Sequence, residues 1–194
     1  MKQRLTKFAS KPGQAIVEFA LMATLIFFLL SAVVDLGLIF FTLQALHNAA
    51  QEGATYGSRN LVLVGNTMQV DVPTIRDRAR HEAGDQGIGF ANLLDLNANG
   101  VDDASEPSVL QSYITVLQLE DTDGNGTPLN DGPAPAYKPC PNPSSNVNGC
   151  FVRVTVSFDY NFLFPFAPAF ANTIKLTSPF EMRIRNGFSQ GGTP

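Results

Sequence analysis

The sequence predicts an α+β protein in which a long amino-terminal transmembrane helix extends into a small outer domain with an antiparallel sheet. Three observations predict this fold: an apolar run at 19–41, a helical pattern without proline that continues to residue 58, and two carboxyl-terminal stretches in which apolar and polar residues alternate. The 194 residues are 44% hydrophobic and only 15% charged, whereas about 25% is usual for soluble proteins. Much of the missing charge is explained by the apolar run.

The first thirteen residues form a basic leader, which we expect to lie in the cytoplasm. The leader contains no acid and four of the basic side chains, Lys2, Arg4, Lys7 and Lys11. The run at 19–41 follows, and as a helix it is about 35 Å long, enough to cross a hydrocarbon core of about 30 Å. Because the next basic residue is Arg59, the charge asymmetry predicts that the carboxyl-terminal part lies outside. A cleaved signal peptide is the alternative, but its apolar region usually has only about 7–15 residues.

A glycine and a glutamate mark the start of the apolar run. Gly13 is followed by Gln14, and Glu18 is the fifth residue after the glycine. This spacing resembles the type IV prepilin processing motif, in which a membrane peptidase cuts after the glycine. A carboxylate at mid-membrane costs up to about 3.5 kcal/mol, so Glu18 favours a partner, which the resemblance implies is the new amino terminus of a neighbouring subunit. Alternatively, Glu18 only marks where the helix enters lipid.

Three separated motifs between residues 13 and 58 resemble the TadE-like family of minor pseudopilins and related proteins of the tight-adherence (Tad, or Flp) pilus. They are QAIVEFA at 14–20, VDLG at 34–37 and ALHNAAQEGA at 45–54. The family usually has Asp-x-Gly-Arg and Ala-Ala-Arg-Glu-Gly-Ala-Arg, whereas this chain has Leu38, Gln51 and Thr55 at the arginine positions. Ion pairs that those arginines make in relatives are therefore not expected here.

The resemblance implies a pilin-like, lollipop-shaped molecule that acts as a non-enzymatic, membrane-anchored pseudopilin-like subunit in Tad pilus biogenesis. It would lie in a bacterial inner membrane, with its amino terminus cytoplasmic and its outer domain periplasmic. Its partners would be the lipid bilayer, the prepilin peptidase and other pilus or pseudopilin subunits. Glu18, Phe19 and Asp35 are then candidates for assembly and register. For Asp35, which lies near the outer end of the span, an interfacial carboxylate that reaches water is an equally good interpretation.

The domain boundaries follow from these features. We expect the leader at 1–13, a transmembrane and continuing helix at 14–58 that ends around Gly57, and an extracytoplasmic α+β domain at 59–194. Within that domain, Asp71, Pro73 and Gly84 are start and stop signals of a short helix. Strands are predicted at 112–120, 151–158 and 173–185, with one buried and one solvent-facing side. The connection at 162–170 is apolar and is expected to pack on the helix, the bilayer, a partner or the core.

Acidic loops occupy residues 95–131, where no Lys or Arg occurs. Residues 95–106 match D-x-[DN]-x-[DN]-G-x₅-E, the EF-hand type of calcium loop, whose oxygen ligands suit a hard cation. Residues 121–126 repeat its first half only, and plain Asn/Asp/Gly turns are the alternative for both loops. The candidate ligands of a Ca²⁺ cofactor are Asp95, Asn97, Asn99, Val101, Asp103 and Glu106 in the first loop, and Asp121, Asp123 and Asn125 in the second.

Two cysteines, Cys140 and Cys150, bracket a loop rich in Pro, Asn and Ser. Outside the cytoplasm a disulfide is the expected state, and closing this loop contributes about 3 kcal/mol on the chain-entropy model. Zinc would need two more ligands, and neither histidine is close in sequence.

Composition and motifs exclude several functions. With 13 basic and 17 acidic side chains and a net charge of −4, the chain lacks the basic excess of a nucleic-acid-binding protein. It has no hydrolase elbow, metalloprotease helix, phosphate loop or dinucleotide fingerprint, so no enzyme is predicted. The alternative to a pseudopilin-like subunit is a permanently anchored periplasmic binding or adhesion module that calcium stabilises.

Overall fold

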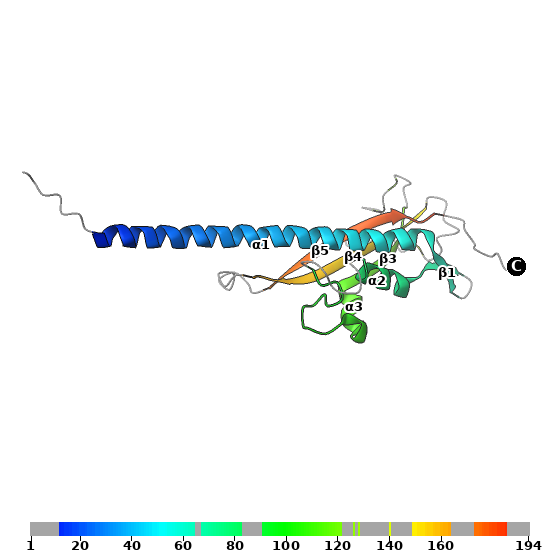
Figure 1. Cartoon of the computed structure of the whole chain (residues 1–194). Coiled ribbons are helices and arrows are strands. Elements are labelled where there is room, and N and C mark those ends of the chain that lie inside the picture. Colours follow the sequence, from blue (N-terminus) through cyan, green and yellow to red (C-terminus); the bar gives the residue numbers. More distant parts are fainter. Residues whose placement is uncertain are drawn as a thin grey trace, which may run out of the picture.

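The protein is a long helical rod with a small α+β head along its carboxyl-terminal half (Figure 1). The computed structural model describes residues 12–64, 67–82, 91–121, 149–163 and 173–185, together with Gly126, Pro128 and Cys140. In chain order the elements are α1 (Pro12–Arg59), β1 (Leu61–Val64), β2 (Thr67–Val70), α2 (Val72–Arg80), the 3-10 helix η1 (Asp103–Ser105), α3 (Pro107–Tyr113), β3 (Ile114–Glu120), β4 (Cys150–Asn161) and β5 (Thr173–Arg183). The predicted α+β class with a long amino-terminal helix is confirmed.

Helix α1 is continuous over 48 residues. Its single proline, Pro12, is the first residue, where a missing N–H costs nothing, and the rest of the sequence offers no break. The helix ends two residues after the predicted Gly57, where the backbone N–H and the side-chain amide of Asn60 both donate to the carbonyl of Tyr56 at 3.0 and 3.2 Å. The apolar part predicted to span the membrane and the part that supports the head are thus one continuous helix.

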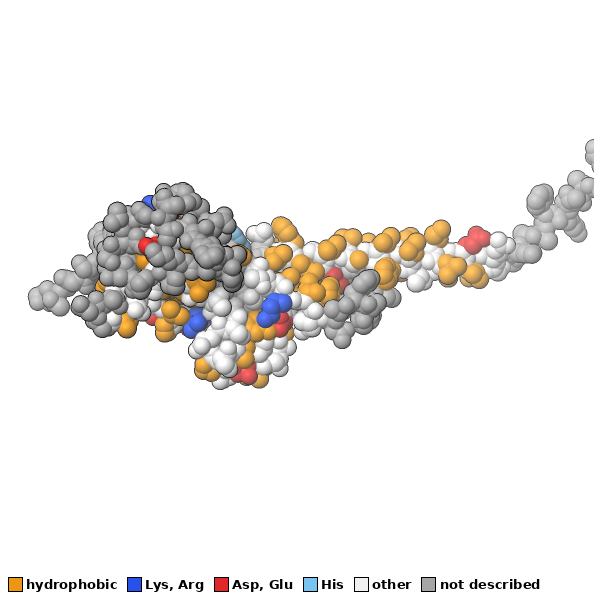
Figure 2. Space-filling view, turned by 180° about the vertical axis from the view of Figure 1, so that it is seen from behind, with side chains coloured by type: hydrophobic (Ala, Val, Ile, Leu, Met, Phe, Trp, Pro, Cys, Tyr) orange, Lys and Arg blue, Asp and Glu red, His pale blue; other side chains and the backbone are white. Residues whose placement is uncertain are grey.

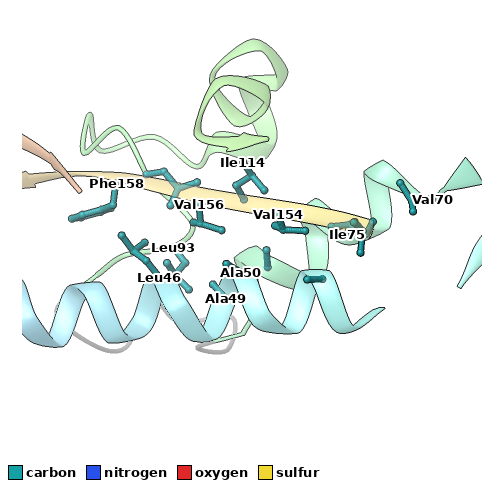
Figure 3. Packing of buried hydrophobic residues seen from close by; sticks show 14 of the residues in the cluster. Leu46, Ala49, Ala50, Val70, Ile75, Leu93, Ile114, Val154, Val156 and Phe158 are labelled. Atoms are coloured by element: carbon teal, nitrogen blue, oxygen red, sulfur yellow. The ribbon is translucent and has the colours of Figure 1, made fainter. Parts of the chain in front are cut away.

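The head is built on an antiparallel sheet with the strand order β3-β4-β5. The central strand β4 pairs residue by residue with both neighbours, so that Val154, for example, lies opposite Val116 and Phe180. Helix α1 packs on one face of β4 and β5. In Figure 3, Leu46, Ala49 and Ala50 of α1 point toward β4. The sheet thus needs small side chains on α1 so that the two backbones can approach closely.

One prediction about the sheet is wrong. We expected Arg153, Thr155 and Ser157 of β4 to face solvent, but Arg153 is only 9% exposed and Ser157 is also buried. These side chains pair across strands: Arg153 forms an ion pair with Glu181, and the hydroxyls of Ser157 and Thr177 lie 3.1 Å apart. Cross-strand pairing on a central strand therefore buries the polar face as well. The edge strand β5 keeps the predicted alternation from Thr173 to Pro179, whereas Phe180, Glu181 and Met182 are all half-buried.

Other boundaries differ modestly from the predictions. The strand expected from Ser112 begins at Ile114, because residues 107–113 form α3 with Pro107 in its first turn. The β1–β2 hairpin was not predicted. Helix α2 is confirmed, and its cap is the predicted Asp71, whose carboxylate accepts from Thr74 N at 3.3 Å. The predicted stop at Gly84 lies outside the described residues.

Candidate functional site

The amino-terminal half of α1 leaves its apolar side chains uncovered by the rest of the described chain. Figure 2 shows hydrophobic side chains along the rod where it extends beyond the head. Phe19 is 74% exposed, and the other large exposed side chains of this half are Ile16, Val17, Leu21, Met22, Leu25, Ile26, Phe27, Phe28, Leu29, Leu30, Val33, Val34 and Leu36. Length and hydropathy make this helix able to cross a membrane, so it fits a single-pass membrane anchor.

Glu18 lies on this exposed half, with Gln14 one turn before it. The side-chain amide of Gln14 donates to Glu18 Oε1 at 2.9 Å. This partner is neutral, and the sequence has no Lys or Arg between Lys11 and Arg59. Among the described residues, no basic side chain therefore forms an ion pair with Glu18. Gly13 precedes this pair, and a Cβ placed there would meet none of the described atoms within 4 Å.

Asp35 is the second acid of the rod, and it contacts the head of the same chain. It is only 7% exposed, and its Oδ1 accepts from the Tyr160 hydroxyl at 3.2 Å and from the backbone N–H of Leu163 at 3.1 Å. Burial, then the charge of Asp35 and this hydrogen bond, raise the pKa of Tyr160 to about 12, which keeps the hydroxyl protonated as a donor. Sequence reasoning did not find these partners, because they lie at the end of β4, far away along the chain.

The third motif, at 45–54, lies on the surface of α1 against which the head packs; we call this surface the seat. Leu46, Ala49, Ala50 and Ala54 are fully buried. Gly53 of the motif and Gly57, which follows it, face α2 and β4, and a Cβ at Gly53 would lie 3.3 Å from Ile75 Cγ2 and Val154 Cγ1. A Cβ at Gly57 would lie 2.7 Å from Ile75 Cδ1 and 3.2 Å from Val152 Cγ2. The small residues of this motif thus serve close packing of helix on sheet.

The first acidic loop crosses the head between α2 and α3 and is fastened to the core by Leu93 and Leu96, which are both buried. In Figure 3, Leu93 lies between α1 and β4. The carbonyl of Leu96 accepts from the backbone N–H of Asp159 on β4 at 2.8 Å. The loop backbone is therefore held by the sheet on which the head is built.

Hydrogen bonds close this loop upon itself. The two carboxylate oxygens of Asp95 accept from the backbone N–H groups of Asn99 and Gly100 at 3.0 and 2.8 Å. Gly100 has φ +87°, a conformation that favours glycine. Asn97 Oδ1 accepts from Asn99 N at 3.1 Å, and Glu106 Oε2 accepts from the Asn99 side-chain amide at 3.0 Å. Val101 is exposed at the outer turn.

Asp103 is the buried acid of the loop. One carboxylate oxygen accepts from Leu96 N at 2.7 Å, while Oδ1 has no hydrogen-bond partner among the described residues. Burial raises the pKa of Asp103, and the charges of Asp95 and Glu106 act in the same direction, whereas the Leu96 N–H and Arg80 oppose them. No group of three His, Cys, Asp or Glu side chains converges on one point within the described part of the chain.

The second acidic loop is described only in part. Asp121 is buried, and its Oδ2 accepts from Gly126 N at 3.0 Å, which matches the contact between Asp95 and Gly100. Gly126 also has a positive φ, +89°. Asp123 and Asn125 lie outside the described residues, as do residues 164–170 of the apolar connection.

The predicted disulfide between Cys140 and Cys150 is present in the structure, with the two Cα atoms 6.0 Å apart. Cys150 begins β4, and the backbone N–H of Cys140 donates to the carbonyl of Gln118 on β3 at 3.1 Å. The bond therefore links Cys140, which is hydrogen-bonded to β3, to the first residue of β4.

Comparison with known proteins identifies one segment. Residues 13–55 match the family model described as TadE-like protein. No curated protein and no solved structure matches the chain. Of the three positions where we expected arginine in relatives, Leu38 is half-buried against the core and Gln51 is exposed. The matched segment covers the exposed rod, Glu18, Asp35 and most of the surface on which the head packs, so the resemblance drawn from the sequence is confirmed for residues 13–55, which are similar to the TadE-like family.

Proposed function

We propose that this chain is a non-enzymatic, membrane-anchored, pseudopilin-like subunit in Tad pilus biogenesis. The observation that carries the proposal is the continuity of α1: one helix of 48 residues leaves its apolar amino-terminal half exposed and seats a folded head on its other half. An apolar surface of this length needs cover. Lipid covers it while the subunit is in the membrane, and neighbouring helices cover it during assembly.

Glu18 supplies the register in this proposal. Its only described partner is the neutral amide of Gln14, and a carboxylate in an apolar environment is stabilised most by a positive charge. Cleavage after Gly13 would make the α-amino group of Gln14 such a charge. Pairing of Glu18 with that group on a neighbouring subunit would fix how far two helices slide along each other, and the exposed Phe19 would pack beside the pair.

The same proposal places the chain in a bacterial inner membrane. The basic leader at 1–13 keeps the amino terminus cytoplasmic by the positive-inside rule, and the head is then periplasmic. The Cys140–Cys150 disulfide is consistent with that oxidising compartment. The partners are the bilayer, the prepilin peptidase and other pilus subunits.

Amino-terminal analysis of the full chain tests the proposal. Intact-mass analysis of protein from cells with an active prepilin peptidase should find Gln14 as the first residue. Gly13→Leu should abolish cleavage without disturbing the helix, since a Cβ at this position meets no described neighbour. A Glu18→Gln variant separates processing from assembly: it should still be inserted, but it should co-purify with fewer pilus subunits than the wild type. Glu52→Gln is its matched control, because Glu52 is a half-exposed acid on the head-bearing part of the same helix.

A wild-type chain that keeps Met1 in such cells would contradict the pseudopilin mechanism. It would favour the permanently anchored, calcium-stabilised binding or adhesion module instead. Equal co-purification of the Glu18→Gln and Glu52→Gln variants would refute the role of Glu18 in register.

A further inference from the structure

We propose that the loop from Asp95 to Glu106 binds a calcium ion that fixes the crossing between α2 and α3 in the head. The inference does not depend on the pilus function, because it concerns the head alone. It rests on a buried carboxylate oxygen that has no partner among the described residues, on the closed shape of the loop and on the chemistry of its donor groups.

The unpartnered oxygen is Oδ1 of Asp103. The residue is 0% exposed, and within the described part of the chain only Oδ2 is satisfied, by Leu96 N at 2.7 Å. A buried polar atom without a hydrogen bond costs about 1–3 kcal/mol, and more if it is charged. Native proteins contain few such atoms, and the binding of an ion is one physical reason for keeping one. A cation bound to Oδ1 would remove this cost.

Arg80 is a basic residue whose charge acts on Asp103, and its buried Nε has no hydrogen-bond partner among the described residues. Its Nη2 binds the carboxylate of Asp102, the neighbour of Asp103. Asp102 also caps η1 by accepting from Ala104 N at 2.7 Å. The arginine therefore compensates Asp102, and Asp103 retains an oxygen to which no described group donates.

Asp95 and Glu106, the first and last residues of the loop, are held by hydrogen bonds within it. Asp95 accepts from two backbone N–H groups, of Asn99 and Gly100, which leaves each carboxylate oxygen with further lone pairs. Glu106 Oε2 accepts from the side-chain amide of Asn99 at 3.0 Å. The last ligand position of the motif, Glu106, is therefore already in contact with the fifth position, Asn99. The charges of Asp95 and Glu106 both act on Asp103.

The charges of Asp95 and Glu106 repel that of Asp103. These three carboxylates do not converge on one point in the described structure, and a divalent cation bound between them would draw them together. The donor groups of this loop are all hard oxygens: carboxylates at Asp95, Asp103 and Glu106, amides at Asn97 and Asn99, and the backbone carbonyl of Val101. Six or more such ligands in a loop that can adjust suit Ca²⁺ better than Mg²⁺, which requires a near-ideal octahedron and retains water. The loop has no His or Cys that would favour zinc.

Such an ion would act on the stability of the head. Leu93 lies between α1 and β4. Leu96 is fully buried, and its carbonyl accepts from Asp159 N. An ion that joins Asp95 to Glu106 would therefore tie the loop that joins α2 to α3 onto the central strand. Binding to the folded state alone raises stability as the ion concentration rises above the dissociation constant.

Calcium binding is tested on the full chain in detergent micelles after removal of metal with a chelator. Equilibrium dialysis with radioactive Ca²⁺ should show saturation with a dissociation constant of about 0.1–1 mM, as in extracellular modules. Differential scanning calorimetry at about ten times that concentration should show a melting temperature raised by about 3 °C or more. Mg²⁺ at the same concentration should produce less than half of this shift.

Glu106→Gln is the decisive variant, since glutamine still accepts from Asn99 and keeps the fold, but it removes a charged ligand. Its calcium affinity should fall about tenfold or more, and the melting shift should disappear. Asp77→Asn, an exposed acid of α2, is the matched control and should bind calcium as the wild type does. Absence of saturable binding below about 10 mM, or equal binding by the Glu106→Gln variant and the wild type, would overturn the proposal. An equal response to Mg²⁺ would overturn the assignment to calcium.

Discussion

The two halves of α1 are one uninterrupted helix, yet they solve different packing problems. In the amino-terminal half, large apolar residues such as Phe19 and Leu36 point outward on all sides. In the carboxyl-terminal half, a stripe that includes Leu46 and Gly57 is pressed against the head, and polar residues such as Gln51 face outward. The comparison shows that the distribution of apolar residues around the helix matches the surroundings of each half. A helix that is apolar on all sides suits lipid, and an amphipathic helix suits packing against a globular core.

The strongest test of this difference compares two leucines. Leu46→Ala should lower the free energy of unfolding of the head by about 3 kcal/mol, because Leu46 is fully buried and its loss leaves a cavity. Leu36→Ala should change this free energy by less than about 0.5 kcal/mol, because Leu36 is 65% exposed. Urea titration of the full chain in micelles, followed by tyrosine fluorescence, measures both. Equal losses would show that the head also covers the amino-terminal half.

Substitutions of two glycines, one in each half of α1, test the same difference in packing with a smaller expected effect. Gly57→Val should destabilise the head by about 2 kcal/mol, because its Cβ would lie 2.7 Å from Ile75 Cδ1 and overpack the seat. Gly37→Val should have no such effect, since no described atom lies within 4 Å of a Cβ there. The same urea titration compares the two variants. If Gly57→Val were neutral, the close approach of α1 to α2 would not be required for stability.

The smallest expected effect concerns the contact that joins Asp35, in the amino-terminal half of α1, to β4 of the head. Tyr160→Phe removes the hydroxyl that donates to Asp35 and should cost about 1 kcal/mol, the usual net value of a hydrogen bond. Leu163 N still donates to the same oxygen, which limits the loss. Tyr56→Phe is the control, because it keeps the ring over which Arg78 lies. If the two variants were equally stable, Asp35 would not hold the head.

Local signals in the sequence predicted much of the fold. Apolar length, helical spacing and the cap at Asp71 are properties of neighbouring residues, so α1 and α2 were found with small errors at their ends. Helix α3 was missed because its seven residues are too few to show a helical period. The solvent-facing side predicted for β4 was wrong because the partner of Arg153 is Glu181, on another strand.

The candidate sites were predicted less completely, for the same reason. Gly13, Gln14 and Glu18 follow from spacing alone, and the disulfide follows from compartment and cysteine count. The partners of Asp35 are more than a hundred residues away along the chain, and no periodicity could identify them. The unpartnered oxygen of Asp103 is likewise a property of the folded head, although the motif had already singled out the residue.

The unbroken backbone of α1 has a mechanical consequence. Because α1 has no break between its two halves, a rotation of the exposed half about the helix axis also rotates the head. One residue of helix corresponds to about 1.5 Å of travel and about 100° of rotation. If two such rods slip by a single residue against each other, their heads must also move by that step and point in different directions. In any assembly of these chains, the register of the packed helices would therefore determine the positions and orientations of the heads on the outer surface.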